Sequence, residues 1–101
     1  MHLVELLLPL QDNRGTPFPR GLFRAVQEHL TDAFGGATAF IRAPAEGTAR
    51  AEEELERDEI VVFEVMAKEL DRDWWREYRA QLESTFKQRK IVIRTHQVEL
   101  L

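Results

Sequence analysis

Apolar residues follow two different periods along this chain, and together these periods predict six elements. Four stretches are rich in β-branched or aromatic residues that alternate with a period of two, which favours strands. They cover residues 3–8, 37–43, 59–67 and 90–96. Residues 59–67 are apolar on both faces, as is typical of a strand in the middle of a sheet.

The first of two helical patterns extends to Phe34. Thr16 has the character of an N-cap, and Pro17 is tolerated in a first turn, where its missing N–H has no intrahelical partner. Gly35 and Gly36 predict a left-handed stop at the other end. We therefore expect a helix from Pro17 to Phe34 with one apolar face.

The second helical pattern runs from Trp74 to about Arg89, with Asp71 or Asp73 as its cap. Its apolar side predicts the buried positions Trp75, Tyr78, Arg79, Leu82 and Phe86. Two adjacent tryptophans are compatible with an aromatic ligand box, but large aromatics at helical spacing more often anchor a helix to a sheet. We therefore expect both to pack against the core.

The resulting order is strand, helix, strand, strand, helix, strand over a single domain of residues 1–101. This order predicts an α+β fold of the ferredoxin-like, or split βαβ, type. Right-handed crossovers place both helices on one face of a four-stranded antiparallel sheet. The first and third strands then lie in its centre.

An acidic connection over residues 45–58 joins the second and third strands. Such charge blocks usually form a solvated loop. The spaced acidic residues and central glycine of a calcium-binding loop are absent from its sequence. We therefore expect a loop of low local stability without a metal.

Composition and charge argue against several classes of partner. The chain has a net charge of −4, a pI near 5.4 and no prominent basic stripe, so neither nucleic acid nor an anionic membrane surface is an expected partner. It contains no cysteine, which excludes disulfides and thiolate metal sites. The N-terminal residues lack the basic start of a signal peptide, and no apolar run reaches membrane-spanning length. A cytoplasmic location is the expectation.

With both helices on one side, the other side of the sheet, here called the open face, needs a different cover. The period of two assigns ten residues to it: Leu3, Glu5, Leu7, Ile60, Val62, Glu64, Met66, Val92, Arg94 and His96. The second strand adds Thr38, Phe40 and Arg42 if its small residues pack under a helix. An apolar patch of this size is larger than a monomer normally exposes. A homodimer through the open face is therefore expected.

Three segments carry a resemblance to known proteins: Phe-Gly-Gly-Ala-Thr-Ala-Phe at 34–40, Ala-Pro-Ala-Glu-Gly at 43–47 and Asp-Glu-Ile-Val-Val-Phe-Glu-Val at 58–65. They resemble an uncharacterised family of small bacterial proteins. In architecture the whole chain resembles the dimeric α+β barrel superfamily, whose subunits pair sheet to sheet. That superfamily contains cofactor-independent monooxygenases, isomerases and haem-handling enzymes, and also modules without catalysis. Its catalytic residues share no motif, so the resemblance implies no role for any residue of this chain.

The charged side chains within the apolar open face are the candidates for a functional site. In one interpretation they are ion pairs that fix the register of a dimer, because a buried charge persists only when it is paired. In the other, Glu64 or Glu5 acts as a general base, His96 relays a proton and Arg94 holds an anionic substrate. No spacing typical of a metal site, and no phosphate-binding or dinucleotide motif, is present in the sequence. No cofactor or metal is therefore expected.

Two hypotheses from different classes follow. The first is a non-catalytic dimeric module, with a small-molecule ligand or a protein as its partner. The second is a cofactor-independent enzyme, monooxygenase-like or isomerase-like, acting on a small anionic or aromatic molecule. An enclosed void lined by Glu5, Glu64, Arg94 or His96 would favour the enzyme, and a filled sheet interface would favour the module.

Overall fold

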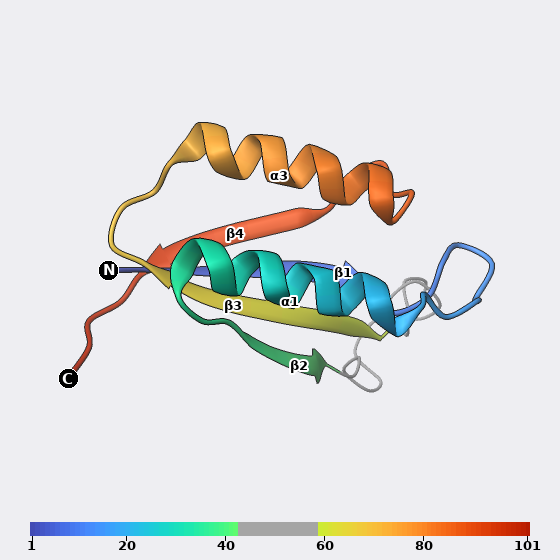
Figure 1. Cartoon of the computed structure of the whole chain (residues 1–101), viewed down its shortest axis with the longest axis horizontal. Coiled ribbons are helices and arrows are strands. Elements are labelled where there is room, and N and C mark those ends of the chain that lie inside the picture. Colours follow the sequence, from blue (N-terminus) through green and yellow to red (C-terminus); the bar gives the residue numbers. More distant parts are fainter. Residues whose placement is uncertain (43–58) are drawn as a thin grey trace, which may run out of the picture.

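The computed structural model describes residues 1–42 and 59–101, and it contains the six expected elements in the expected order. The strands and helices are β1 (His2–Pro9), α1 (Arg20–Phe34), β2 (Thr38–Arg42), β3 (Ile60–Ala67), α3 (Arg72–Thr85) and β4 (Val92–Gln97). The strands form one sheet in the order β2-β3-β1-β4, and every neighbouring pair is antiparallel (Figure 1). The predicted ferredoxin-like arrangement with β1 and β3 in the centre is confirmed. The acidic connection at 45–58 lies outside the described residues.

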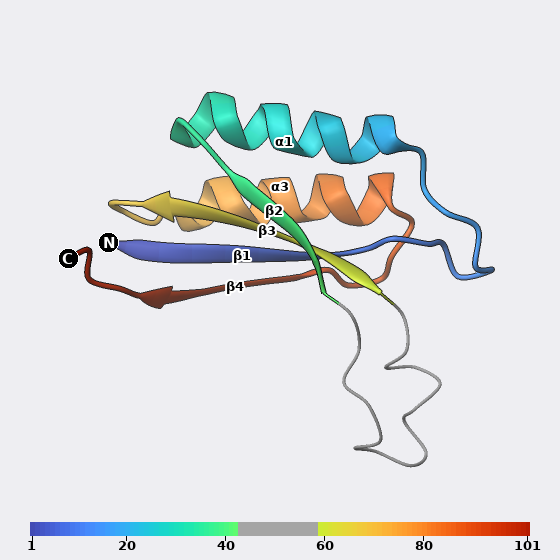
Figure 2. The same ribbon diagram turned by 90° about the horizontal axis from the view of Figure 1, so that it is seen from below.

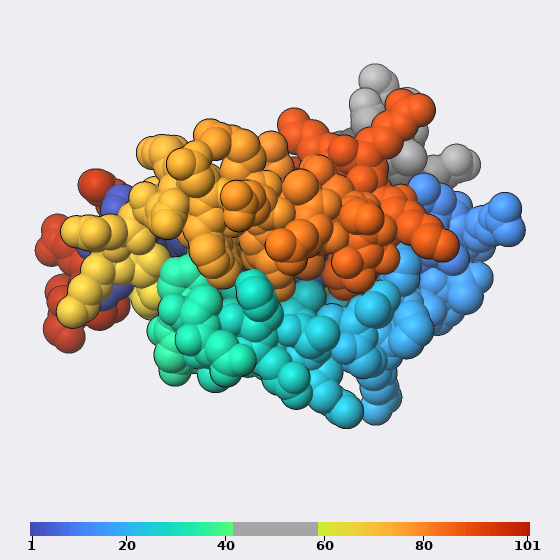
Figure 3. Space-filling model, turned by 45° about the horizontal axis from the view of Figure 1, so that its top comes forward, coloured from blue at the N-terminus to red at the C-terminus, as the bar shows by residue number. Residues whose placement is uncertain are grey.

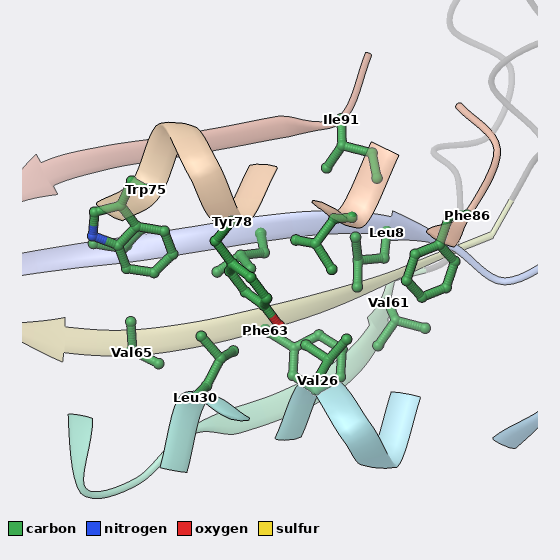
Figure 4. Close-up of a cluster of buried hydrophobic side chains, with 13 residues drawn as sticks. Leu8, Val26, Leu30, Val61, Phe63, Val65, Trp75, Tyr78, Phe86 and Ile91 are labelled. Atoms are coloured by element: carbon green, nitrogen blue, oxygen red, sulfur yellow. The ribbon is translucent and has the colours of Figure 1, made fainter. Parts of the chain in front are cut away.

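Both helices lie on the same side of the sheet (Figure 2). They cover the face to which alternate residues of the central strands point, so β1 buries Val4, Leu6 and Leu8 while the residues between them remain partly accessible. In Figure 4, side chains of β3 and α1 reach into one cluster with those of β1. Phe63 and Phe86 are the largest fully buried side chains of this core.

The first helix begins at Arg20. The prediction that Thr16 caps it is wrong, because Pro19 occupies the N-cap position. Pro17 instead forms an isolated antiparallel bridge with Gln11. A proline disfavours helical backbone in the residue before it, and here two prolines stand two residues apart. The chain therefore stays extended until Pro19, which occupies the N-cap position without a side-chain cap hydrogen bond. The predicted stop at Gly35 is confirmed by its left-handed φ of 83°.

The second helix, α3, is capped by Asp71, whose carboxylate accepts a hydrogen bond from the backbone N–H of Trp74 at 3.1 Å. It ends at Thr85, earlier than predicted, because the chain turns at Lys87 with a left-handed φ of 52°. Arg79 was expected on the buried side, and this is wrong. Its side chain is 46% exposed, since a guanidinium stays in water unless it is fully paired.

Aromatic side chains of the two helices pack against each other. Trp75 is buried and stacks on Phe34 of α1 with ring centroids 5.2 Å apart. Trp74 is half-buried and stacks on His29, at 5.6 Å and an interplanar angle of 10°. The tryptophan pair therefore packs between the helices, and His29 lies beside it at the margin of α1. Figure 3 shows the two helices side by side over this face of the molecule.

Tyr78 joins the same cluster, and its burial raises its pKa to about 12 from an ordinary value of 10.0. The folded state thus holds the phenol proton more tightly than the unfolded state does. The neutral Tyr78 phenol therefore stabilises the folded state relative to the unfolded state. This stabilisation is complete below pH 10 and is lost as the pH rises from 10 to about 12. The free energy of unfolding should fall there by up to about 1.4 kcal/mol per pH unit.

Tyr78 is the only tyrosine of the chain, so absorbance of the tyrosinate reads this group alone. Urea unfolding at several alkaline pH values should show the expected loss of stability. The Tyr78→Phe variant keeps the ring and removes the titration, so its stability should decline less steeply over the same range. Equal slopes for the two proteins would contradict the assignment.

Candidate functional site

One row of charged side chains crosses the open face of the sheet. Antiparallel pairing places Thr38 of β2, Glu64 of β3, Glu5 of β1 and Arg94 of β4 opposite one another in that order. Side chains in register point to the same face of a sheet, so three of the four predicted site residues are neighbours. The second strand also contributes the residues that were assigned to it conditionally, since Phe40 and Arg42 pair with Val62 and Ile60 of the same face.

Glu5 and Arg94 form the central interaction of this row. The Arg94 Nε–H donates to Glu5 Oε1 at 2.9 Å, and the Glu5 side chain is only 16% exposed. On its other side, Glu5 faces Glu64 across the β1–β3 pairing. Like charges directly opposite each other destabilise a sheet, so Arg94 offsets a repulsion that the sequence builds into the two central strands.

His96 and Arg42 lie apart from this pair. His96 is opposite Leu3, one row further along the open face, and is exposed. A diagonal neighbour of that kind lies roughly 7–8 Å away, beyond direct proton transfer to Glu5. Arg42 pairs through its backbone with Ile60, and its side chain lies outside the described part of the chain. The structure therefore brings Glu5, Glu64 and Arg94 together but does not add His96 as a proton relay.

An open hollow of about 510 Å³ borders Glu64 at the end of the sheet. Its lining comes from the α1–β2 connection and from β1 and β3: Leu3, Phe34, Gly35, Gly36, Ala37, Thr38, Glu64, Val65 and Met66. Within residues 1–42 and 59–101, Glu64 is the only charged residue of this lining. The hollow thus places one carboxylate beside apolar surface, without a second acid–base group from the predicted set.

An apolar row runs beside the charged one. It consists of Phe40, Val62, Leu7 and Val92, one residue from each strand. Phe40 and Val92 at the two edges are each 43% exposed, whereas Val62 in the middle is only 1% exposed. The expectation that Val62 needs a partner subunit to cover it is therefore wrong, because it is buried within the single chain.

A basic groove that the residue pattern did not predict lies on the opposite side of β4. The groove has a volume of about 210 Å³ and lies between α3 and β4, with four arginines in its lining: Arg72, Arg76, Arg79 and Arg94. The first three stand at i, i+4 and i+7, a spacing that puts them on one side of a helix. The sequence contains this spacing. It did not predict a basic surface because Arg79 was assigned to the buried side of the helix.

Comparison with known proteins gives no further guide. No family model matches the chain, and neither curated proteins nor solved structures yield a significant match. The resemblance to dimeric α+β barrel proteins therefore stays a prediction.

Residues 1–42 and 59–101 contain neither a cluster of metal-ligating side chains nor a membrane-spanning helix. Within these ranges no three His, Asp or Glu side chains lie close enough together to hold a metal ion. Neither described helix has the length and apolar character needed to cross a bilayer. What the described site offers is an ion pair, an additional carboxylate and a set of arginines.

A double-mutant cycle tests the Glu5–Arg94 pair. We expect Glu5→Gln and Arg94→Gln to show a coupling of up to about 1 kcal/mol in the free energy of unfolding, because one partner is largely shielded from water. The control is the Asp73–Arg76 pair of α3, whose side chains are 85% and 68% exposed. Urea unfolding should give that exposed pair the smaller coupling. A larger coupling in the control would contradict the structural role of Glu5–Arg94.

Proposed function

We propose that the protein is a non-catalytic module that forms a homodimer through the open face of its sheet. The observation that carries this proposal is the apolar row across all four strands on the face that neither helix covers. Phe40 and Val92 leave 43% of their surface accessible in the single chain, as does Met66 further along the face. Burial of such side chains is the main driving force of association.

The charged row supports the same proposal. An isologous contact presents the same surface from both copies, so each apolar row meets apolar surface of the other copy. Within the described residues Glu64 has no ion-pair partner. Arg94 and His96 are the basic residues described on this face, so a second copy would supply the opposite charges that Glu64 lacks in the single chain. The charges would then fix the register of the dimer, while the accessible side chains Phe40, Val92 and Met66 would provide apolar area.

The enzyme hypothesis has weaker support. That hypothesis pairs a glutamate base with His96 as its proton relay, which requires the two groups to lie within hydrogen-bond reach of each other. His96 lies in a different row from Glu64. Glu5 is already engaged by Arg94. A dimeric binding module, with a cytoplasmic location, is therefore the better proposal.

Light scattering at micromolar concentration tests the dimer. The wild-type chain should have twice the monomer mass of 11.8 kDa. A variant carrying Met66→Lys and Val92→Lys should be a folded monomer, because both side chains are accessible in the single chain and the new charges oppose association. Val62 is unsuitable for this test, since a charge at that buried position would disrupt the fold itself.

Ile41→Lys is the matched control. Ile41 is also an exposed apolar strand residue, 61% accessible, but it alternates with Phe40 and so points to the other face of the sheet. This variant should remain dimeric. A folded wild-type monomer would refute the proposal, and so would equal dissociation of the control.

A further inference from the structure

The groove between α3 and β4 combines a basic rim with an apolar floor. Among the described residues that line it, four are arginines and none is acidic. The floor is supplied by Val4, Leu70, Trp75 and Ile93. We propose that this groove binds a small organic oxyanion, a phosphomonoester or carboxylate attached to a short aromatic or aliphatic group.

The arginines converge because two distant segments meet there. Arg72, Arg76 and Arg79 stand on one side of α3, and Arg94 comes from β4, which runs along the same edge of the core (Figure 1). A guanidinium presents N–H donors in a planar fork that matches both carboxylate and phosphate oxygens. Arg94 is already held by Glu5 on the open face. The three guanidinium groups of α3 are therefore the donors available to an oxyanion with two or three free oxygens.

The existing partners of these arginines leave room for a ligand. No ion pair within the described residues engages Arg72, and the nearest approach of Arg79 to Glu83 is a long 3.9 Å. Arg76 bonds Asp73 at 2.6 Å, but that pair is highly exposed. Exposed pairs contribute at most about 1 kcal/mol, so a ligand oxyanion can compete for such donors.

The size and floor of the groove restrict the ligand further. Its volume of about 210 Å³ is below the roughly 300–1,000 Å³ of pockets for drug-sized ligands, so only a small molecule fits. The indole of Trp75 and the aliphatic side chains beside it favour a ligand with an apolar part over a bare inorganic ion. The groove lies within one chain, so this proposal does not depend on the dimer.

Phenyl phosphate and benzoate are suitable probes, because they share an aromatic ring and differ in the oxyanion. Titrations monitored by tryptophan fluorescence and by calorimetry should detect binding of at least one of these probes. The probe that binds more tightly shows whether the groove prefers a phosphate or a carboxylate. Benzyl alcohol has the ring without the charge and should not bind. Inorganic phosphate should bind more weakly than phenyl phosphate. Added salt should weaken binding, as for any interaction between accessible charges.

Combined Arg72→Gln and Arg79→Gln substitutions should weaken binding at least about tenfold, because each removes a charged donor. The control is Arg24→Gln, which removes the same charge from an exposed position on α1. It should bind like the wild type. If the double variant fails to fold, Arg72→Gln alone serves, since Arg72 is exposed and has no ion pair in the described residues.

Three results would overturn the proposal: no binding of either probe at millimolar concentration, binding of benzyl alcohol as tight as that of phenyl phosphate, or an equal loss in the Arg24→Gln control. Each leaves the dimer proposal unaffected, because light scattering measures that separately.

Discussion

The antiparallel pairing of β1 with β3 is the constraint on which the rest of the structure depends. It aligns Val4 with Val65 and Leu6 with Phe63, so that one face of the sheet becomes the core. A shift of one residue would turn every side chain of a strand to the opposite face. The same register puts Glu5 against Glu64 on the open face. Core and candidate site are therefore two consequences of one alignment.

Arg94 connects the open face of the sheet with the groove beside α3. It pairs with Glu5 on the open face and also lines the groove beside α3. Its strand, β4, is at the edge of the sheet, where unpaired backbone groups invite another strand. The charge of Arg94 on this edge strand opposes such pairing. Arg94 thus has a structural benefit that is independent of any ligand.

Much of the fold was predictable because it depends on local patterns. Alternation assigned Glu64 and Arg94 to the correct face, and Gly35 ended the first helix as expected. The predicted start of that helix was wrong, since Thr16 has a suitable capping side chain but stands before a proline. The backbone preference of consecutive X-Pro steps outweighed one capping hydrogen bond.

The sequence by itself determined the order of elements, the two central strands and the residue types on each face, because these follow from periods of two and of 3.6 residues. Only the tertiary structure decided which of these residues meet. Val62 is buried between Phe40 and Leu7 although it belongs to the open face. Arg79 lines a groove although its position suggested the core. Such outcomes depend on how a helix is rotated over the sheet and on which distant strands lie beside it, and no local period contains that information.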